Sequence, residues 1–213
     1  NYSLLRHGED HYLVLEALAE RTMEACGLTP YTQVATMFGK SLEGTAFKHP
    51  VFDRPSTSVM ADYVTTEDGT GVVHTAPGHG RDDFFTGMKY GLKVLCPVNE
   101  AGILTEEAGE FQGLSYKQCD TVVVDRLREL GNLLHAEDYV HSYPHAVRDG
   151  KPVIFRATDQ WFVSIDDNDL RTRMMEAIGR VKWHPDTAVA RITAMVSNRP
   201  DWCISRQRPW GVG

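Results

Sequence analysis

Residues 74–83 concentrate two histidines, two aspartates and a Pro-Gly turn within one short stretch. Gly78 and Gly80 allow the backbone to approach a ligand closely and to adopt unusual dihedral angles. A strand end, a glycine-rich loop and a helix start, in this order, often form a ligand-binding site in α/β proteins. The same residues also suit a simple strand-to-helix turn whose polar side chains cap the helix. The residue types alone leave both interpretations open.

Some of these side chains are of types that bind divalent metal ions, which makes a metal hydrolase an alternative. The candidates are His74, His79, Asp82 and Asp83, and neither a His-x-x-x-His pair nor a third distant cluster accompanies them. The four cysteines are scattered and form no Cys-x-x-Cys pair, so half of a zinc site is also missing. We therefore expect no metal here, and reduced thiols typical of a cytoplasmic protein.

Strands and helices must position these residues, and hydrophobic spacing predicts both. Residues 44–73 are rich in Thr, Val, Gly and Pro, a pattern typical of a small β-barrel or a strongly bent sheet. The predicted fold class is mixed α/β with a β-rich first part. The expected helices cover residues 13–26, 81–90, 116–130, 170–178 and 187–196, and the expected strands cover residues 2–6, 31–38, 72–74, 133–139, 153–156 and 202–204.

Charge is divided unevenly along the chain, although the formal net charge is only −7. Residues 1–142 hold 11 Lys and Arg against 21 Asp and Glu, a balance of −10. Residues 143–213 hold 11 against 8, a balance of +3, and contain all four Trp. This shift predicts two regions with different roles. No signal peptide or membrane-spanning run is visible, so we expect a cytoplasmic protein without a membrane partner.

Four separated runs of the sequence closely resemble the editing domain of isoleucyl-tRNA synthetases and the stretch that returns from it to the catalytic domain. The runs are residues 64–84, 141–145, 155–162 and 198–212, and they occur in the same order as in that family. The resemblance implies a β-barrel-like editing domain of the valyl/leucyl/isoleucyl type over residues 1–142. It also implies a smaller α/β segment over residues 143–213 that leads back to the catalytic domain.

The resemblance implies hydrolysis of valine wrongly attached to isoleucine tRNA. Isoleucyl enzymes are the well-known illustration of this need, because a pocket that fits isoleucine cannot strongly reject a side chain one methylene smaller. By position in the motif, Asp83 matches the carboxylate that holds the substrate α-ammonium group, and His74 matches the residue that limits the size of the editing pocket. A positioned water then attacks the ester carbonyl. The further substrate-binding residues implied are Thr75, Ala76, Gly78, His79 and Gly80.

The chain departs from the family pattern in two places. A Thr-Thr-Thr-Pro-Trp-Thr strand that lines the same pocket is not found, and neither are the two signature sequences that bind ATP. We therefore expect an incomplete pocket, weak or absent editing by this piece alone, and no aminoacylation. No cofactor is expected here, since ATP and magnesium serve the full-length enzyme. The expected partners are the mischarged 3′ end of isoleucine tRNA and the remainder of the same synthetase chain.

Two alternatives to this assignment stay open. Valyl-tRNA synthetases share part of residues 74–80 and of residues 202–207, so the chain could edit for valine tRNA instead. The basic, Trp-rich stretch from Pro144 onward could also make the chain a catalytically silent tRNA-binding module. We favour a packing role for those Trp side chains, against the absent catalytic domain.

Overall fold

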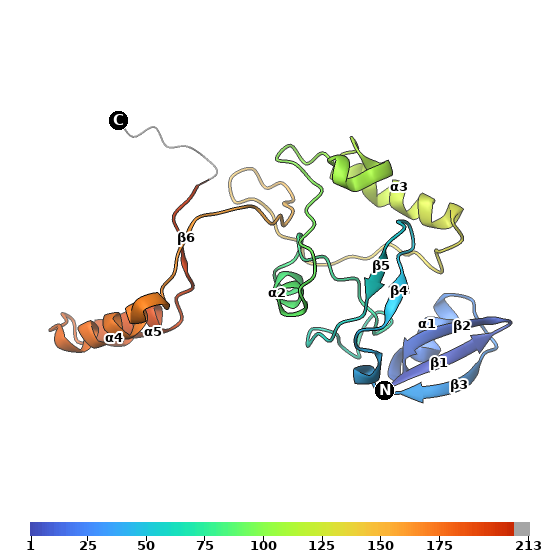
Figure 1. Cartoon of the computed structure of the whole chain (residues 1–213), viewed down its shortest axis with the longest axis horizontal. Coiled ribbons are helices and arrows are strands. Elements are labelled where there is room, and N and C mark those ends of the chain that lie inside the picture. The colour runs from blue at the N-terminus through green and yellow to red at the C-terminus, as the bar shows by residue number, and fades with distance from the viewer. Residues whose placement is uncertain (207–213) are drawn as a thin grey trace. The chain divides into compact units, whose positions relative to one another are not determined.

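The computed structural model describes residues 1–206 and divides into two compact units, residues 1–157 and residues 158–213. Each unit is described by itself (Figure 1). The predicted division of roles between residues 142 and 143 is a statement about function, and it stays a prediction. Trp210 and the end of the last resembling run lie outside the described residues.

Unit 1 begins with an antiparallel sheet, which we call the N-terminal sheet (residues 1–37). Its strands β1 (Tyr2–His7), β2 (Asp10–Leu15) and β3 (Thr32–Met37) follow the order β2-β1-β3. Leu4 of β1 lies opposite Leu13 of β2 and Ala35 of β3. Leu5 and Met23 are almost fully buried at the centre of a small apolar core that also contains Val14, Leu15 and Leu18. The elements are β1 (Tyr2–His7), β2 (Asp10–Leu15), the 3-10 helix η1 (Glu16–Leu18), α1 (Ala19–Ala25) and β3 (Thr32–Met37).

The N-terminal sheet confirms two predicted strands and corrects one predicted helix. The strands predicted at residues 2–6 and 31–38 are present as β1 and β3. The helix predicted for residues 13–26 begins only at Ala19, because the chain before it forms β2 and η1. Pairing of β2 with β1 along its whole length determines the conformation there, and a local apolar pattern contains no information on such a partner.

The rest of unit 1 is built from short elements joined by long irregular segments. The helices predicted at residues 81–90 and 116–130 are confirmed as α2 and α3, and Ser115 and Gln118 form a capping box at the start of α3. The elements are η2 (Gly39–Leu42), β4 (Ala46–Lys48), β5 (Pro55–Thr57), α2 (Arg81–Tyr90), η3 (Glu106–Phe111) and α3 (Tyr116–Glu129).

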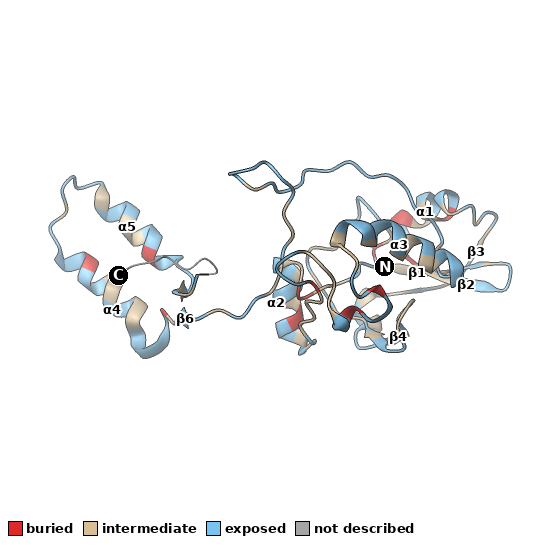
Figure 2. Ribbon diagram, turned by 90° about the horizontal axis from the view of Figure 1, so that it is seen from above, coloured by how far each residue is buried: buried red, intermediate tan, exposed pale blue. Residues whose placement is uncertain are grey.

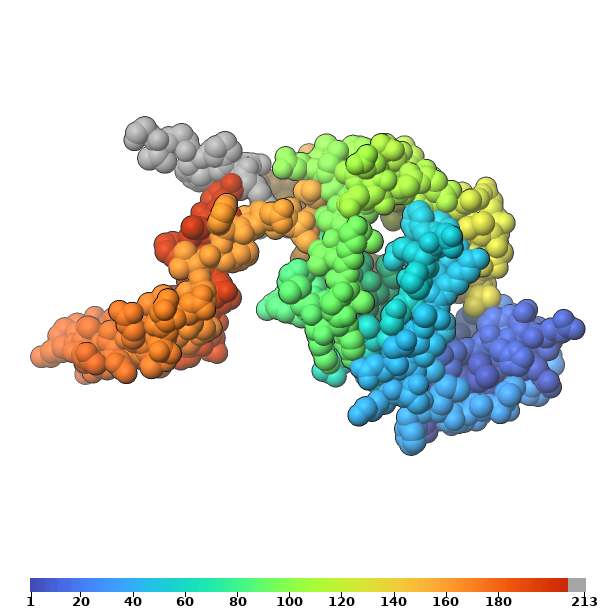
Figure 3. Space-filling model, in the orientation of Figure 1, coloured from blue at the N-terminus to red at the C-terminus, as the bar shows by residue number. Residues whose placement is uncertain are grey.

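The β-barrel predicted from residues 44–73 is not confirmed. Only β4 and β5 form in that stretch, and Figure 3 shows this hairpin (cyan) at the surface of unit 1. The three sheets of residues 1–206 have three, two and two strands, and none of them is closed. The strands predicted at residues 72–74, 133–139 and 153–156 are also absent, and none of these residues joins a strand pair of the described sheets. The predicted mixed α/β fold class is confirmed, and the predicted closed sheet is not.

Unit 2 is a helical hairpin closed by a two-stranded ribbon. The helices predicted at residues 170–178 and 187–196 are confirmed, as is the strand at its end. Figure 2 shows these helices largely exposed; Ile178 and Val196 are their buried residues. Arg171 donates to the carbonyls of Val196, Ser197 and Arg199 and so caps the end of the second helix. The elements are β6 (Phe162–Val163), η4 (Asp167–Asp169), α4 (Leu170–Arg180), α5 (Ala188–Ser197) and β7 (Trp202–Cys203).

Large apolar side chains remain exposed in both units. Trp161 and Trp202 are 77% and 52% exposed, and Met88 of α2 is 62% exposed. No helix within residues 1–206 has the length and apolar character needed to cross a membrane.

Candidate functional site

The marker segment (residues 69–83) starts on the N-terminal sheet. The Tyr2 hydroxyl donates to the Gly71 carbonyl at 2.6 Å, and the Leu15 amide donates to the Thr70 carbonyl at 2.8 Å. Gly71 has a φ of +78°, and a Cβ there would lie 2.3 Å from the Cβ of Leu15. Only glycine satisfies both conditions, so this end of the segment is tied closely to the sheet.

His74 lies on an exposed, irregular stretch and forms no hydrogen bond with any residue from 1 to 206. Burial is the largest of three causes that lower the pKa of His49, which follows β4; the charge of Arg54 is the second, and repulsion by a charge on His74 is the smallest. His49 itself is fixed, since its Nδ1 accepts the amides of Val51 and Phe52 at 3.1 and 3.0 Å. His74 is therefore free to meet a ligand beside a rigid neighbour.

Asp83 is the third residue of α2, and its carboxylate reaches back into the marker segment. Its Oδ2 accepts the amide of Ala76 at 2.9 Å, while Gly80 precedes the helix in an extended conformation. A Cβ at Gly80 would lie 3.0 Å from the same Oδ2, so a small residue leaves room for the carboxylate. No other bond to the Asp83 side chain occurs in the described part of the chain, which leaves Oδ1 available to a cation. The positive end of α2 stabilises the charge.

The turn between His74 and Asp83 is held by its backbone. A Cβ at Gly78 would lie 1.9 Å from the Leu95 carbonyl oxygen, closer than any side chain can come. The Gly78 carbonyl accepts the amide of Ala157 at 2.8 Å, and Nδ1 of His79 lies 2.9 Å from the carbonyl of Phe155. The marker segment is thus fixed from two sides by chain that lies far away in sequence.

The remaining predicted residue is Thr75, whose hydroxyl lies 3.1 Å from that of Tyr63. The structure therefore brings Ala76, Gly80 and Asp83 together directly. His74 and Asp83 lie on either side of the turn, and neither a hydrogen bond nor an ion pair joins them. The roles predicted for these side chains toward a substrate stay predictions.

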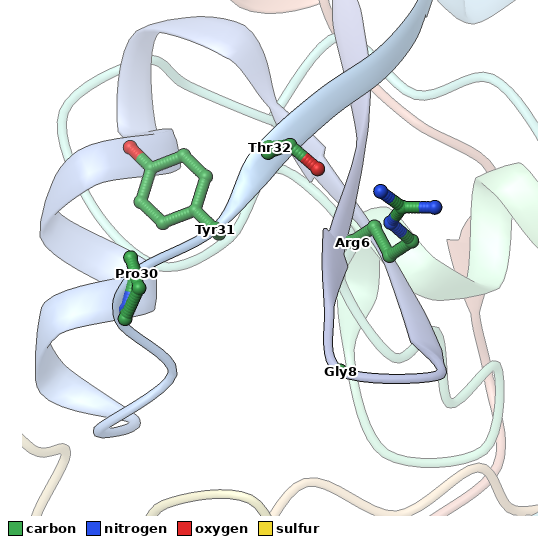
Figure 4. Close-up of a pocket in the computed structure, with 5 residues that line it drawn as sticks. All are labelled: Arg6, Gly8, Pro30, Tyr31 and Thr32. Atoms are coloured by element: carbon green, nitrogen blue, oxygen red, sulfur yellow. The ribbon is translucent and has the colours of Figure 1, made fainter.

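The marker segment lines neither of the two cavities described here. One, of about 220 Å³, lies at the turn end of the N-terminal sheet and is shown in Figure 4. The other, of about 290 Å³, lies between η3 and α3. The first is lined by Arg6, Gly8, Pro30, Tyr31 and Thr32, and the second by Glu110, Phe111, Val122, Asp125, Arg126 and Glu129.

Metal-ligating side chains do not cluster in the part of the chain that the structure describes. No group of three His, Cys, Asp or Glu side chains in it is arranged to hold a metal ion. The four cysteines are free and partly buried. The metal-hydrolase alternative thus receives no support from the described geometry.

Sequence reasoning missed a row of four rings, which we call the aromatic ladder (Tyr139, His141, Tyr143 and His145). Each ring contacts the next, at centroid distances of 5.6, 5.7 and 6.3 Å. The signal was present as an aromatic residue at every second position of residues 139–145. The strand predicted for residues 133–139 ended at the first of these rings, so the alternation over residues 139–145 was not treated as one feature.

Known proteins similar to this chain agree on one family. The family model of the class I tRNA synthetases (I, L, M and V) matches residues 16–213. The isoleucine–tRNA ligase of Fervidobacterium pennivorans is 49% identical over 99% of this chain and 23% of its own length. The corresponding ligases of Bacillus subtilis and Kosmotoga olearia are 48% and 46% identical over 99% and 100% of this chain, again covering 23% of each relative.

This chain spans about a quarter of the length of these curated relatives. The family match, in contrast, runs from the end of β2 through the marker segment and the whole of unit 2. The chain therefore belongs to the class I tRNA synthetases of the I, L, M and V group.

Proposed function

We propose that this chain contributes the editing site of an isoleucine–tRNA ligase and hydrolyses valine mischarged onto isoleucine tRNA. The main supporting observation is the Asp83 carboxylate, held by the Ala76 amide at the start of α2 with one oxygen available. Similarity to isoleucine–tRNA ligases along the whole chain supports the choice of substrate. The step needs no cofactor in this proposal; ATP and magnesium serve aminoacylation elsewhere in the ligase.

Asp83 binds the α-ammonium group of the esterified amino acid. An ammonium group taken out of water needs an anionic partner in fixed geometry, and a charge-assisted hydrogen bond supplies it. The Ala76 amide fixes the orientation of the carboxylate in advance, so little side-chain entropy is lost on binding.

His74 limits the size of the amino-acid side chain that enters. Its ring is exposed, and within residues 1–206 it has no hydrogen-bond partner that would turn it away from a ligand. A single hydrophobic pocket distinguishes poorly between side chains that differ by one methylene, and size exclusion by the His74 ring adds the missing selectivity.

Water attacks the ester carbonyl carbon, the bond to the ribose oxygen breaks, and valine leaves as the free acid. The Gly80 amide at the start of α2 has no acceptor among the described residues and suits the oxygen on which negative charge develops. No covalent enzyme intermediate is required.

Deacylation of valyl-tRNA by the ligase that contains this chain tests the role of Asp83. Asp83→Ala should abolish hydrolysis. Asp83→Asn keeps an oxygen for the Ala76 amide but removes the charge, and should slow hydrolysis about 100-fold. The matched control is Asp82→Asn, since Asp82 is the exposed neighbour in the same helical turn. Wild-type rates for Asp83→Asn would remove its charge from the mechanism.

The role of His74 in specificity is tested with isoleucyl-tRNA, the correctly charged product. His74→Ala should allow cleavage of isoleucyl-tRNA, which the unaltered ligase leaves intact. His11→Ala is the control, because His11 is an exposed residue of β2 whose side chain makes no hydrogen bond with residues 1–206. Continued protection of isoleucyl-tRNA in the His74 variant would contradict the size-limit role.

Comparison of valyl and threonyl esters on their non-cognate tRNAs decides between isoleucyl and valyl editing. We expect the valyl ester of isoleucine tRNA to be hydrolysed faster. A preference for the threonyl ester of valine tRNA would reassign the chain.

A further inference from the structure

The aromatic ladder is a continuous row of rings, and none of the four contacts an aromatic ring outside the row within residues 1–206. Tyr139 and His141 stack with an interplanar angle of 24°, and the next two contacts are edge-to-face at 81° and 86°. In addition, Nδ1 of His145 lies 2.9 Å from the Tyr143 carbonyl oxygen, which holds the last ring in place. The rings contact one another, and all four residues are exposed.

The segment that presents the ladder is exposed along its length. All four rings belong to exposed residues, with Tyr139 and Tyr143 exposed by 70% and 44%. No backbone amide of residues 139–143 donates a hydrogen bond within the part of the chain that the structure describes. An exposed row of aromatic side chains on such a segment indicates a surface that binds a partner.

Ring chemistry points to unpaired bases as the partner. Every nucleobase has a flat π-face, and aromatic side chains in a row provide successive stacking positions irrespective of sequence. Tyrosine and histidine combine such a face with a polar edge that tolerates water, unlike the aliphatic side chains that line grooves for helical peptides. Arg148, shortly after the ladder, makes no ion pair with any of residues 1–206 and can contact a phosphate.

The chain runs from the ladder directly to the marker segment. His145 pairs with Pro152 in an isolated bridge, and the following residues Phe155 and Ala157 bond to His79 and Gly78. The ladder and the marker segment are thus joined by a short stretch within unit 1.

We propose that the aromatic ladder binds the unpaired 3′ end of tRNA by stacking its bases on the rings. This proposal rests on the proposed function, which brings the terminal aminoacylated nucleotide of that 3′ end to the marker segment. The ladder holds the nucleotides that precede the terminal one, and it positions the strand without contacting the ester.

Binding of deacylated tRNA to the ligase that contains this chain tests the proposal. Tyr143→Ala should weaken binding about tenfold, as should Tyr139→Ala, because each variant removes one ring on which a base stacks. Tyr143→Phe should bind as the unaltered protein does, since it keeps the ring. The matched control is Val140→Ala, which removes a 96% exposed side chain from the same segment without touching a ring.

Two probes make the outcome specific to the 3′ end. A tRNA without its unpaired 3′ nucleotides should bind all variants equally. A fluorescent cytidine analogue just before the terminal adenosine should be quenched by the unaltered protein and not by the double Tyr139→Ala, Tyr143→Ala variant. Equal weakening on truncated tRNA would overturn the proposal. So would unchanged tRNA affinity with a lower unfolding temperature, which would show that the rings pack against protein.

Kinetics separate this proposal from the proposed function. Ladder variants should raise KM for valyl-tRNA and leave kcat unchanged, whereas Asp83→Asn lowers kcat. A ligase that does not hydrolyse valyl-tRNA would defeat the proposed function. The quenching and truncation results would still decide whether the ladder binds the 3′ end.

Discussion

The N-terminal sheet and the marker segment belong to the same unit, but different forces hold them in place. The sheet is a paired structure around a small apolar core in which Leu5 and Met23 are 1% and 0% exposed. The marker segment has no regular pairing before α2, and its shape depends on glycines at close backbone approaches and on a few polar bonds. Burial stabilises the first; exact backbone geometry defines the second.

The difference shows why the marker segment suits a binding site. A packed core loses its shape gradually when one side chain shrinks, because neighbours partly fill the space. A loop fixed by single contacts keeps exposed groups such as His74 available to a ligand, yet depends strongly on each contact. Functional residues commonly lie on such loops, positioned by a rigid scaffold.

The largest expected effect comes from the core. Met23→Ala should lower the free energy of unfolding by about 4 kcal/mol, because a fully buried side chain leaves a cavity. Met88→Ala, at a 62% exposed position of α2, should change it by less than about 0.5 kcal/mol. Urea unfolding followed by circular dichroism measures both. Similar losses for the two variants would mean that the sheet is not the stable part of unit 1.

A slightly smaller effect is expected from the turn of the marker segment. Gly78→Ala should cost about 3 kcal/mol, because the new Cβ would overlap the Leu95 carbonyl and force the backbone apart. Gly179→Ala in α4 meets no atom within 4 Å and should stabilise by about 0.5 kcal/mol through helix propensity. The same urea titration compares them. A neutral Gly78→Ala would contradict the close approach.

The bond that joins the two regions should have an intermediate effect. Tyr2→Phe removes the hydroxyl that donates to the Gly71 carbonyl and should cost about 1 kcal/mol. Tyr12→Phe, on the neighbouring strand, removes a hydroxyl without a bond to residues 1–206 and serves as the control. A double variant with Gly78→Ala shows whether the losses add. Non-additive losses would indicate that sheet and marker segment unfold together.

The smallest effect concerns Thr75. Thr75→Val removes the hydroxyl contact with Tyr63 and should cost about 0.5 kcal/mol, since the residue is only partly buried. The rate of valyl-tRNA hydrolysis separates this structural contact from the substrate-binding role predicted for Thr75, because an unchanged rate means that Thr75 only shapes the loop. A large loss of rate with unchanged stability would place its hydroxyl at the substrate.

Helices were the most predictable part of the fold. α2, α3, α4 and α5 appear where apolar spacing and end signals placed them, because those signals are local. The helix predicted for residues 13–26 is present only from Ala19 to Ala25, since Val14, Leu15 and Leu18 suit either period and pairing of β2 with β1 decided the conformation before it. The predicted barrel was not confirmed for a related reason: a strand requires a partner, and a single stretch of sequence does not reveal that partner.

The candidate site was predictable in composition and only partly in geometry. Spacing placed Asp83 in the first turn of a helix, and the structure confirms that position. The bond from Ala76 to Asp83 and the contact of Gly78 with Leu95 depend on how the turn closes, which residue types do not specify. The aromatic ladder, in contrast, could have been predicted from the sequence, because its aromatic residues alternate along residues 139–145.

The bond from the Ala157 amide to the Gly78 carbonyl has a practical consequence for studies in solution. That amide can exchange its hydrogen with water only when the turn of the marker segment opens. Its exchange rate therefore reports the free energy of that opening, separately from unfolding of the N-terminal sheet. One peptide spanning residue 157 gives a continuous measure of how well the segment is formed, with or without tRNA.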